Sequence, residues 1–245
     1  MAVRTSGQEK THFTVVLAGC ADGTKLPPVI IFKRKTFSKE KIPTGVIVHM
    51  HEEGWMNEGG MKICLNRVWS RRPGGLLKKP ALLIFDHFKA HVTQSAKATA
   101  ADLKTQPAVI PGGLTSQLPP LYISVNNPLK ALMRKEWRSW MLSAGDDLTP
   151  AGRVREASIA QVCDWTQRSW KGVEKEVAVK SFKKCSISNA VDGLRPMKFT
   201  RMKKVTLQKT LVMYKLKKRI LLILSMKKHC WPSLMHKYHK FVTRI

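Results

Sequence analysis

Apolar residues follow first a strand pattern and then a helix pattern along the start of the chain. The β-branched, apolar stretch 11–19 ends at the turn signal ADGT, and a second apolar run occupies 28–35. Two such runs around a turn predict an antiparallel hairpin, and a short strand around 46–48 is predicted after it. Over 56–71 the apolar residues recur at helical spacing, which is typical of a stripe that packs in the core.

A continuous apolar run, ALLIF, then leads to Asp86 and is typical of a strand that is buried on both faces. The elements predicted after it are a helix over about 92–104, a strand at 107–110 and helices over 128–141, 155–171 and 173–184. The alternation of strands and helices predicts an α/β fold.

This pattern makes Asp86 the candidate functional residue. A carboxylate at the carboxyl end of a buried strand lies where α/β folds build their sites. A buried acid also needs a cation, a metal or several hydrogen bonds to stay ionised. Alternatively, Asp86 caps the helix that follows it, and the sequence leaves both roles open.

Charge divides the chain into two parts. The formal net charge is +28, and residues 194–245 contain 15 Lys or Arg and no Asp or Glu. Such an excess predicts attraction to polyanions, and the break in composition predicts a boundary near Gly193.

Five widely spaced cysteines without a C-x-x-C pair are typical of reduced intracellular thiols. The N-terminus lacks the apolar segment of a signal peptide, so we expect a soluble intracellular protein.

Three long stretches resemble the DDE superfamily endonuclease domain: KTHFTVVLAGCADGTKLPPVIIFKRKT, LLIFDHFKAHVT and AVIPGGLTSQLPPLYISVNNPLKALMRKEWRSWM. The resemblance is to the pogo/Tigger transposase class, with its jerky-like and centromere-binding protein B relatives, and it runs from residue 1 to about Gly193. It implies a ribonuclease H-like mixed sheet flanked by helices. In that domain, three acidic side chains hold two Mg²⁺ or Mn²⁺ ions for strand cleavage and transfer.

The resemblance leaves this chain with one of the three family acids. Asp86 matches the second acid, Tyr122 stands at the position of the third, and the first lies on a strand that would precede residue 1. A neutral phenol is a poor ligand for Mg²⁺ at pH 7. We therefore expect a truncated, degenerate and catalytically inactive DDE protein without a metal cofactor. The helix-turn-helix domains that precede the catalytic domain in this class are also not expected.

The first strand of a ribonuclease H-like domain lies in the middle of the sheet, between the strands that correspond here to 11–19 and to the run ending at Asp86. Its loss predicts two unpaired strand edges. We expect a partial DDE domain over 1–145, a helical extension of it over 146–193, and a basic tail over 194–245 that is disordered or irregularly helical.

The tail has no counterpart in the family. Its segment MKFTRMKK, read one base earlier, can encode an acidic run, so we interpret the tail as the product of a one-base frame change near Gly193. Its candidate nucleic-acid-binding residues are Lys203, Lys204, Lys215, Lys217, Lys218 and Arg219.

Together these features predict a transposon-derived protein that is not an enzyme and that binds nucleic acid, chiefly DNA, without sequence specificity. The cluster at 215–219 resembles a nuclear-import signal, and with the family it predicts a nuclear location and no membrane partner. One alternative is an interaction module that pairs its sheet edges with a related transposase-derived protein. Another is a translated relic without a selected role, and a residual metal-dependent endonuclease has the least support.

Overall fold

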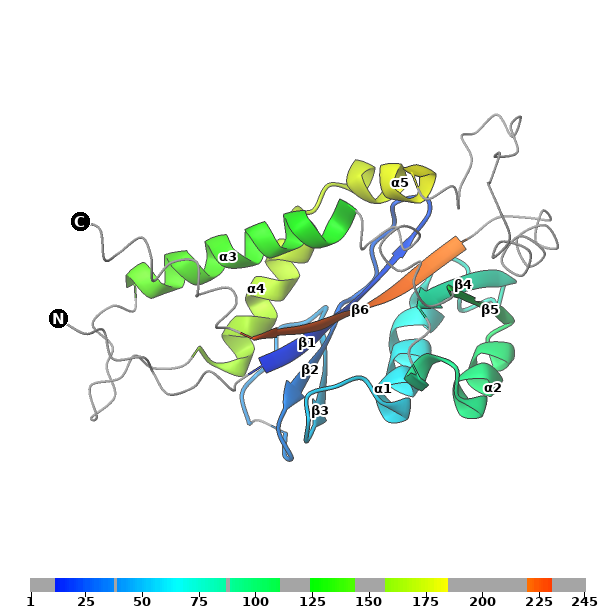
Figure 1. The fold of residues 1–245 in the computed structure, drawn as a ribbon, viewed down its shortest axis with the longest axis horizontal. Helices are drawn as coiled ribbons and strands as arrows, with labels where there is room; N and C mark the ends of the chain where they lie inside the picture. Colours follow the sequence, from blue (N-terminus) through cyan, green and yellow to red (C-terminus); the bar gives the residue numbers. More distant parts are fainter. Residues whose placement is uncertain are drawn as a thin grey trace.

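The computed structural model describes residues 12–37, 39–86, 89–110, 124–143, 157–184 and 220–230. Only the backbone is described for 220–230 and for His12, Asp86 and Lys89. These residues form a mixed sheet with helices on both faces (Figure 1). The strands are β1 His12–Cys20, β2 Val29–Lys33, β3 Ile47–His51, β4 Ala81–Asp86, β5 Thr105–Ile110 and β6 Ile220–Cys230. The helices are α1 Glu58–Ile63, α2 Gln94–Asp102, α3 Asn126–Ser143, α4 Ile159–Gly172 and α5 Lys175–Lys184. The predicted α/β fold is confirmed.

The strands lie in the order β3-β2-β1-β6-β4-β5. β1 and β2 are antiparallel, with Val15 opposite Ile30, which confirms the predicted hairpin. β2 and β3 are parallel, as are β4 and β5. β6 lies between β1 and β4, antiparallel to the first and parallel to the second. The last strand of the described chain is therefore a central strand of its sheet.

β6 corrects two predictions. The tail was expected to be disordered or irregularly helical, yet residues Ile220–Cys230 form a strand. Two open sheet edges were also expected, yet β6 pairs with both β1 and β4. The physical reason is the uninterrupted apolar run at 220–224, which suits a position between two strands whose residues, such as Leu17 and Ile84, are fully buried. Pairing there also satisfies backbone groups that water cannot reach.

Successive residues of β1 face opposite sides of the sheet, and each side has its own core. Val15 and Leu17 belong to a core that residues of α3, α4 and α5 complete. Val16 and Ala18 belong to a second core, with residues of α1 and α2. This two-residue alternation places the three later helices on one face and the two earlier helices on the other (Figure 1). α4 and α5 confirm the two helices predicted over 155–184.

The segment predicted as a helix over 56–71 is helical but not uniform. α1 ends at Ile63, and a π-helical turn at Cys64–Val68 and a 3₁₀ turn at Trp69–Arg71 follow it. The predicted apolar stripe is confirmed as core. Its buried members are Met61, Leu65, Val68 and Trp69.

None of the described helices is long and apolar enough to cross a lipid bilayer.

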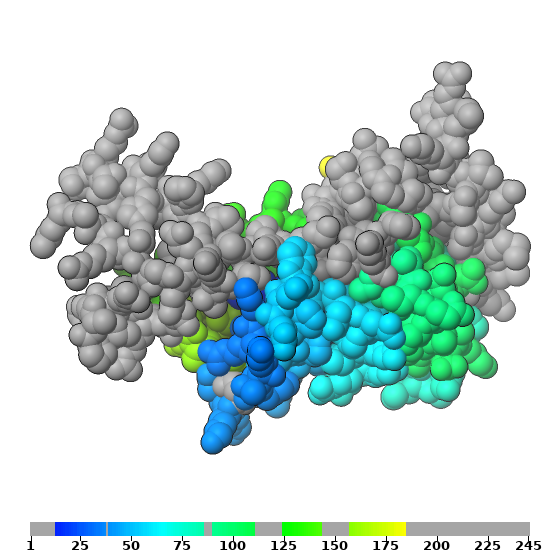
Figure 2. Space-filling view, turned by 60° about the horizontal axis from the view of Figure 1, so that its bottom comes forward, coloured from blue at the N-terminus to red at the C-terminus, as the bar shows by residue number. Residues whose placement is uncertain are grey.

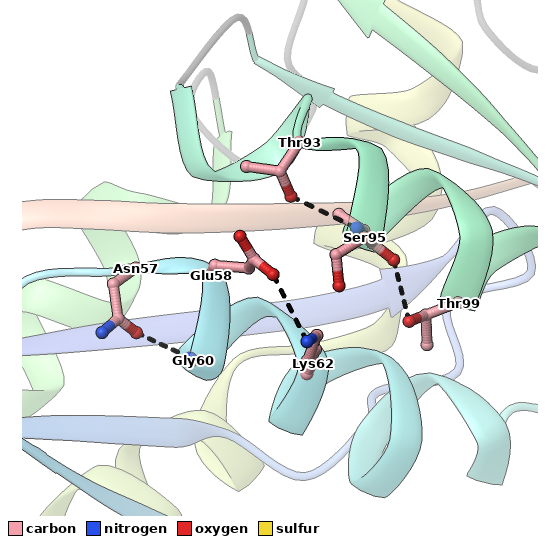
Figure 3. A network of polar contacts seen from close by, with 8 residues as sticks. Asn57, Glu58, Gly60, Lys62, Thr93, Ser95 and Thr99 are labelled. Atoms are coloured by element: carbon pink, nitrogen blue, oxygen red, sulfur yellow. Dashed lines mark hydrogen bonds and ion pairs between the residues drawn. The ribbon is translucent and has the colours of Figure 1, made fainter.

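Polar side chains fix the starts of α1 and α2 (Figure 3), and a hydrogen bond between side chains joins the two helices. Asn57 and Thr93 act as N-caps, each accepting a hydrogen bond from the backbone N–H three residues ahead. Glu58 in α1 has its pKa lowered by a hydrogen bond with Ser95 of α2 and by Lys62. The two helices therefore form one unit on their face of the sheet.

Candidate functional site

Asp86 is the last residue of β4, and the five residues before it are all buried. β5 runs parallel to β4 and ends at Ile110, the register partner of Asp86. The backbone therefore places Asp86 at the edge where the carboxyl ends of two parallel strands meet, as the sequence predicted. Because its side chain is not among those described, its catalytic role and its capping role both stay predictions.

The other predicted site residues lie outside the described ranges. Tyr122, which stands at the position of the third family acid, falls within 111–123. The tail cations fall within 185–219; they are Lys203, Lys204, Lys215, Lys217, Lys218 and Arg219. The described structure does not bring any of these residues together with Asp86, and their roles stay predictions.

β6 is the neighbour of β4 on the side away from β5. The register places Leu82, Leu83 and Ile84 beside 220–222. The strand reads ILLILSMKKHC and contains no Asp or Glu. The strand beside Asp86's own strand therefore adds no carboxylate to this edge of the sheet.

The described side chains do not form a metal centre. No group of three or more His, Cys, Asp and Glu among them is placed to hold a metal ion. Just beyond β4, His91 is fully buried, and its ring centroid lies 5.2 Å from that of Phe85. This contact is typical of core packing and was not predicted from the sequence.

The described cysteines are buried thiols. Cys64 and Cys163 are free, and burial raises the pKa of each to about 12, with the nearby charge of Glu40 adding to the effect at Cys163. Neither is therefore ionised at neutral pH, and neither is a nucleophile. The interpretation of the cysteines as reduced intracellular thiols stays a prediction.

One exposed basic segment was not predicted from the sequence. Residues 33–41 read KRKTFSKEK, and their described side chains are all exposed. The first three of these residues belong to the apolar run predicted over 28–35, but β2 ends at Lys33. The sequence signal for this segment is a group of cations on both sides of Phe37, with no other apolar residue among them.

Comparison with known proteins now identifies the family, because the sequence profile of the DDE superfamily endonucleases matches residues 10–182. The chain belongs to this family. Two curated relatives are the pogo transposable elements with KRAB domain of Homo sapiens and Mus musculus, which are 36% and 35% identical to the chain over 190 residues. A third, the pogo transposable element with ZNF domain of Homo sapiens, is 27% identical over 137 residues, which is 56% of this chain and 10% of the relative. The predicted resemblance is confirmed.

The match to these relatives is partial on both sides. It covers 78% of this chain but 31% of the first two relatives, so the chain spans about a third of their length. No solved structure matches the chain. The DDE profile ends at residue 182, so β6 comes from outside the matched segment although it lies in the middle of the sheet.

Proposed function

We propose that this protein is a transposase-derived DDE-domain protein that is not an enzyme and that binds nucleic acid, chiefly DNA, without sequence specificity. The observation that carries the proposal is charge: the net value is +28, and more than half of it lies in residues 194–245. Such an excess binds phosphates by releasing counterions, so the affinity falls steeply as salt rises. Nuclear location is part of the proposal, because chromosomal DNA is the expected ligand and 215–219 resembles an import signal.

The order of the strands supports a ribonuclease H-like arrangement as part of this proposal. In that fold the first strand lies between the strands that correspond to β1 and β4. β6 occupies this position, antiparallel to β1 and parallel to β4. We therefore propose that β6 substitutes for the first strand of the family domain.

The available donor atoms argue against nuclease activity. Two-metal strand cleavage needs several carboxylates around a pair of divalent ions. Asp86 supplies one, the phenol of Tyr122 is neutral at pH 7, and β6 contains no acid. These residues do not fit a two-metal centre, and we assign no catalytic step to them.

The interaction-module alternative rested on open strand edges in the centre of the sheet. β6 pairs with the edges of both β1 and β4, so that support is gone. Nucleic-acid binding rests on charge alone and is unaffected by this pairing.

The test of binding is fluorescence anisotropy of a labelled DNA duplex with the full chain over a range of salt concentrations. We expect log K to fall linearly with log salt. Replacing the six tail cations by Gln should reduce the slope by up to about 5, at about 0.9 per phosphate contact. These substitutions are preferable to deleting residues 194–245, because the deletion would also remove β6. Absence of binding at low salt would refute the proposal.

The test of inactivity is nicking of supercoiled plasmid with Mg²⁺ or Mn²⁺. We expect no nicking by the purified chain. Metal-dependent nicking that is lost on Asp86→Ala would show a working active site and overturn this part of the proposal.

A further inference from the structure

The segment that leaves β2 carries five cations, one acid and an aromatic ring. We name residues 33–41, KRKTFSKEK, the basic loop. All of its described side chains are exposed, and Phe37 has 63% of its surface accessible. Figure 2 shows this part of the chain as the blue projection at the bottom of the view. The basic loop therefore extends from the body of the protein and is open to a ligand.

Contacts with α4 hold the base of this projection. The carboxylate of Glu40 accepts a hydrogen bond of 2.8 Å from the backbone N–H of Ala160, in the first turn of α4. The side chain of Gln167 donates to the carbonyl of Thr44, farther along the same connection. The loop is thus fixed to the rigid part of the domain, which lowers the entropy cost of binding.

The single acid of the basic loop is directed to α4. A carboxylate at the N-terminus of a helix interacts favourably with the helix dipole, so Glu40 is satisfied away from the loop cations. Lys35 lies 3.7 Å from Glu52, but both side chains are mostly exposed, and such pairs contribute little. Within the described residues, Arg34, Lys39 and Lys41 form no ion pair, so their charges are available to phosphates.

Phe37 decides which form of nucleic acid the basic loop fits. Every unpaired base offers a π-face to an aromatic side chain, and such stacking is independent of sequence. In a duplex these faces are stacked on neighbouring base pairs and are not accessible to a ring on a loop. A cationic loop with an exposed ring therefore matches a single strand, whose phosphates and bases are both accessible.

We propose that the basic loop is a contact site for single-stranded nucleic acid, in which Phe37 stacks on an unpaired base and the surrounding cations bind phosphates. The inference rests on the proposed nucleic-acid binding, and it adds the location of a site and the preferred form of the ligand. It assigns part of the affinity to the folded domain, whereas the earlier candidates all lie in the tail.

The first experiment measures binding of the full chain to a labelled oligo(dT) 20-mer and to a duplex of equal length. Phe37→Ala should weaken binding to the single strand by about fivefold or more and leave duplex binding within about twofold. Phe37→Trp should retain the affinity. Leu142→Ala is the matched control, because Leu142 is another large apolar side chain at 87% exposure but lies at the end of α3.

The second experiment removes charge at two places. Replacing Arg34, Lys35, Lys39 and Lys41 by Gln should lower the salt slope for the single strand by up to about 3, at about 0.7 per phosphate contact. The control replaces four exposed lysines near the start of β5 by Gln and removes the same charge. These are Lys78, Lys79, Lys97 and Lys104. The control should change the slope less than the loop variant does, and circular dichroism confirms that both variants are folded.

The outcomes separate the site from the general proposal. If the wild-type chain binds neither oligonucleotide at low salt, the proposed function itself is wrong. If it binds but the loop variant behaves like its control, binding stands and the assignment to the basic loop is wrong. Stacking on an unpaired base is refuted if Phe37→Ala weakens single-strand and duplex binding to the same extent. It is also refuted if Phe37→Ala weakens neither.

Discussion

The position of β6 can be tested with one substitution, because a native cysteine lies beside it. In the antiparallel pair of β1 and β6, the register partner of Cys20 is Leu221. Directly opposite residues in such a pair have Cα atoms about 4.5–5.5 Å apart, within the range of about 4.4–6.8 Å that disulfides span. We expect Leu221→Cys to form a disulfide with Cys20 within one chain.

The size of the effect follows from the length of the loop that this disulfide closes. For a loop of about 200 residues, chain entropy alone gives about 5 kcal/mol of stabilisation at 25 °C. Strain and residual structure in the unfolded chain reduce such values, so we expect about 2–4 kcal/mol. At about 2–4 °C per kcal/mol for a chain of this size, Tm should rise by about 5–15 °C on oxidation.

The assay compares oxidised and reduced Leu221→Cys by calorimetry, non-reducing electrophoresis and peptide mass spectrometry. Cys185 and Cys230 are first replaced by Ser, so that their thiols cannot compete. Leu222→Cys is the control, because its register partner is Gly19 and no disulfide with Cys20 is expected. Equal cross-linking in both variants, or none in either, would refute the placement of β6. Disulfide-linked dimers would show that a second chain supplies the strand.

Three further predictions concern stability and reactivity. Lys25 Nζ donates to three backbone carbonyls at the C-terminal end of α4, at 2.6–2.9 Å, and so caps this helix. Lys25→Met should therefore lower the free energy of unfolding by about 1–3 kcal/mol in urea titrations. An unchanged midpoint and slope would contradict the capping role. Burial and the neighbouring His51 lower the pKa of His49, so the unfolded chain binds its proton more readily and stability should fall as the pH drops below about 6.5. His49→Gln should reduce that fall between pH 7.5 and 5.5, and an identical pH profile would count against the assignment. Cys64 and Cys163 should resist Ellman's reagent until denaturant is added, and rapid labelling of either in the native protein would contradict their burial.

The sequence predicted those elements whose cause is local. The alternation around Val15 and Ile30 predicted the hairpin, and the unbroken apolar run before Asp86 predicted a buried strand. The position of Asp86 at a strand end also follows from that run. The π-helical turn at Cys64–Val68 was not predicted, because helical spacing does not distinguish it from α-helix.

The features that the sequence did not predict depend on the rest of the fold. A five-residue apolar run such as 220–224 is compatible with a strand or a helix, and the position between β1 and β4 selects the strand. The basic loop was missed for a similar reason. Whether Phe37 packs in a core or stays exposed depends on what lies next to it, and periodicity does not reveal that.

The central position of β6 also sets the order in which the sheet can form during synthesis. β1 is made about 200 residues before its neighbour β6, which at about 5–20 residues per second corresponds to a delay of roughly 10–40 s. Throughout this delay the inner edges of β1 and β4 lack the strand that later pairs with both. Open edges recruit other strands, so we expect the nascent chain to depend on chaperones until β6 has been made and paired. Premature termination before residue 220 would then yield a chain that aggregates, although the whole segment matched by the family had been translated.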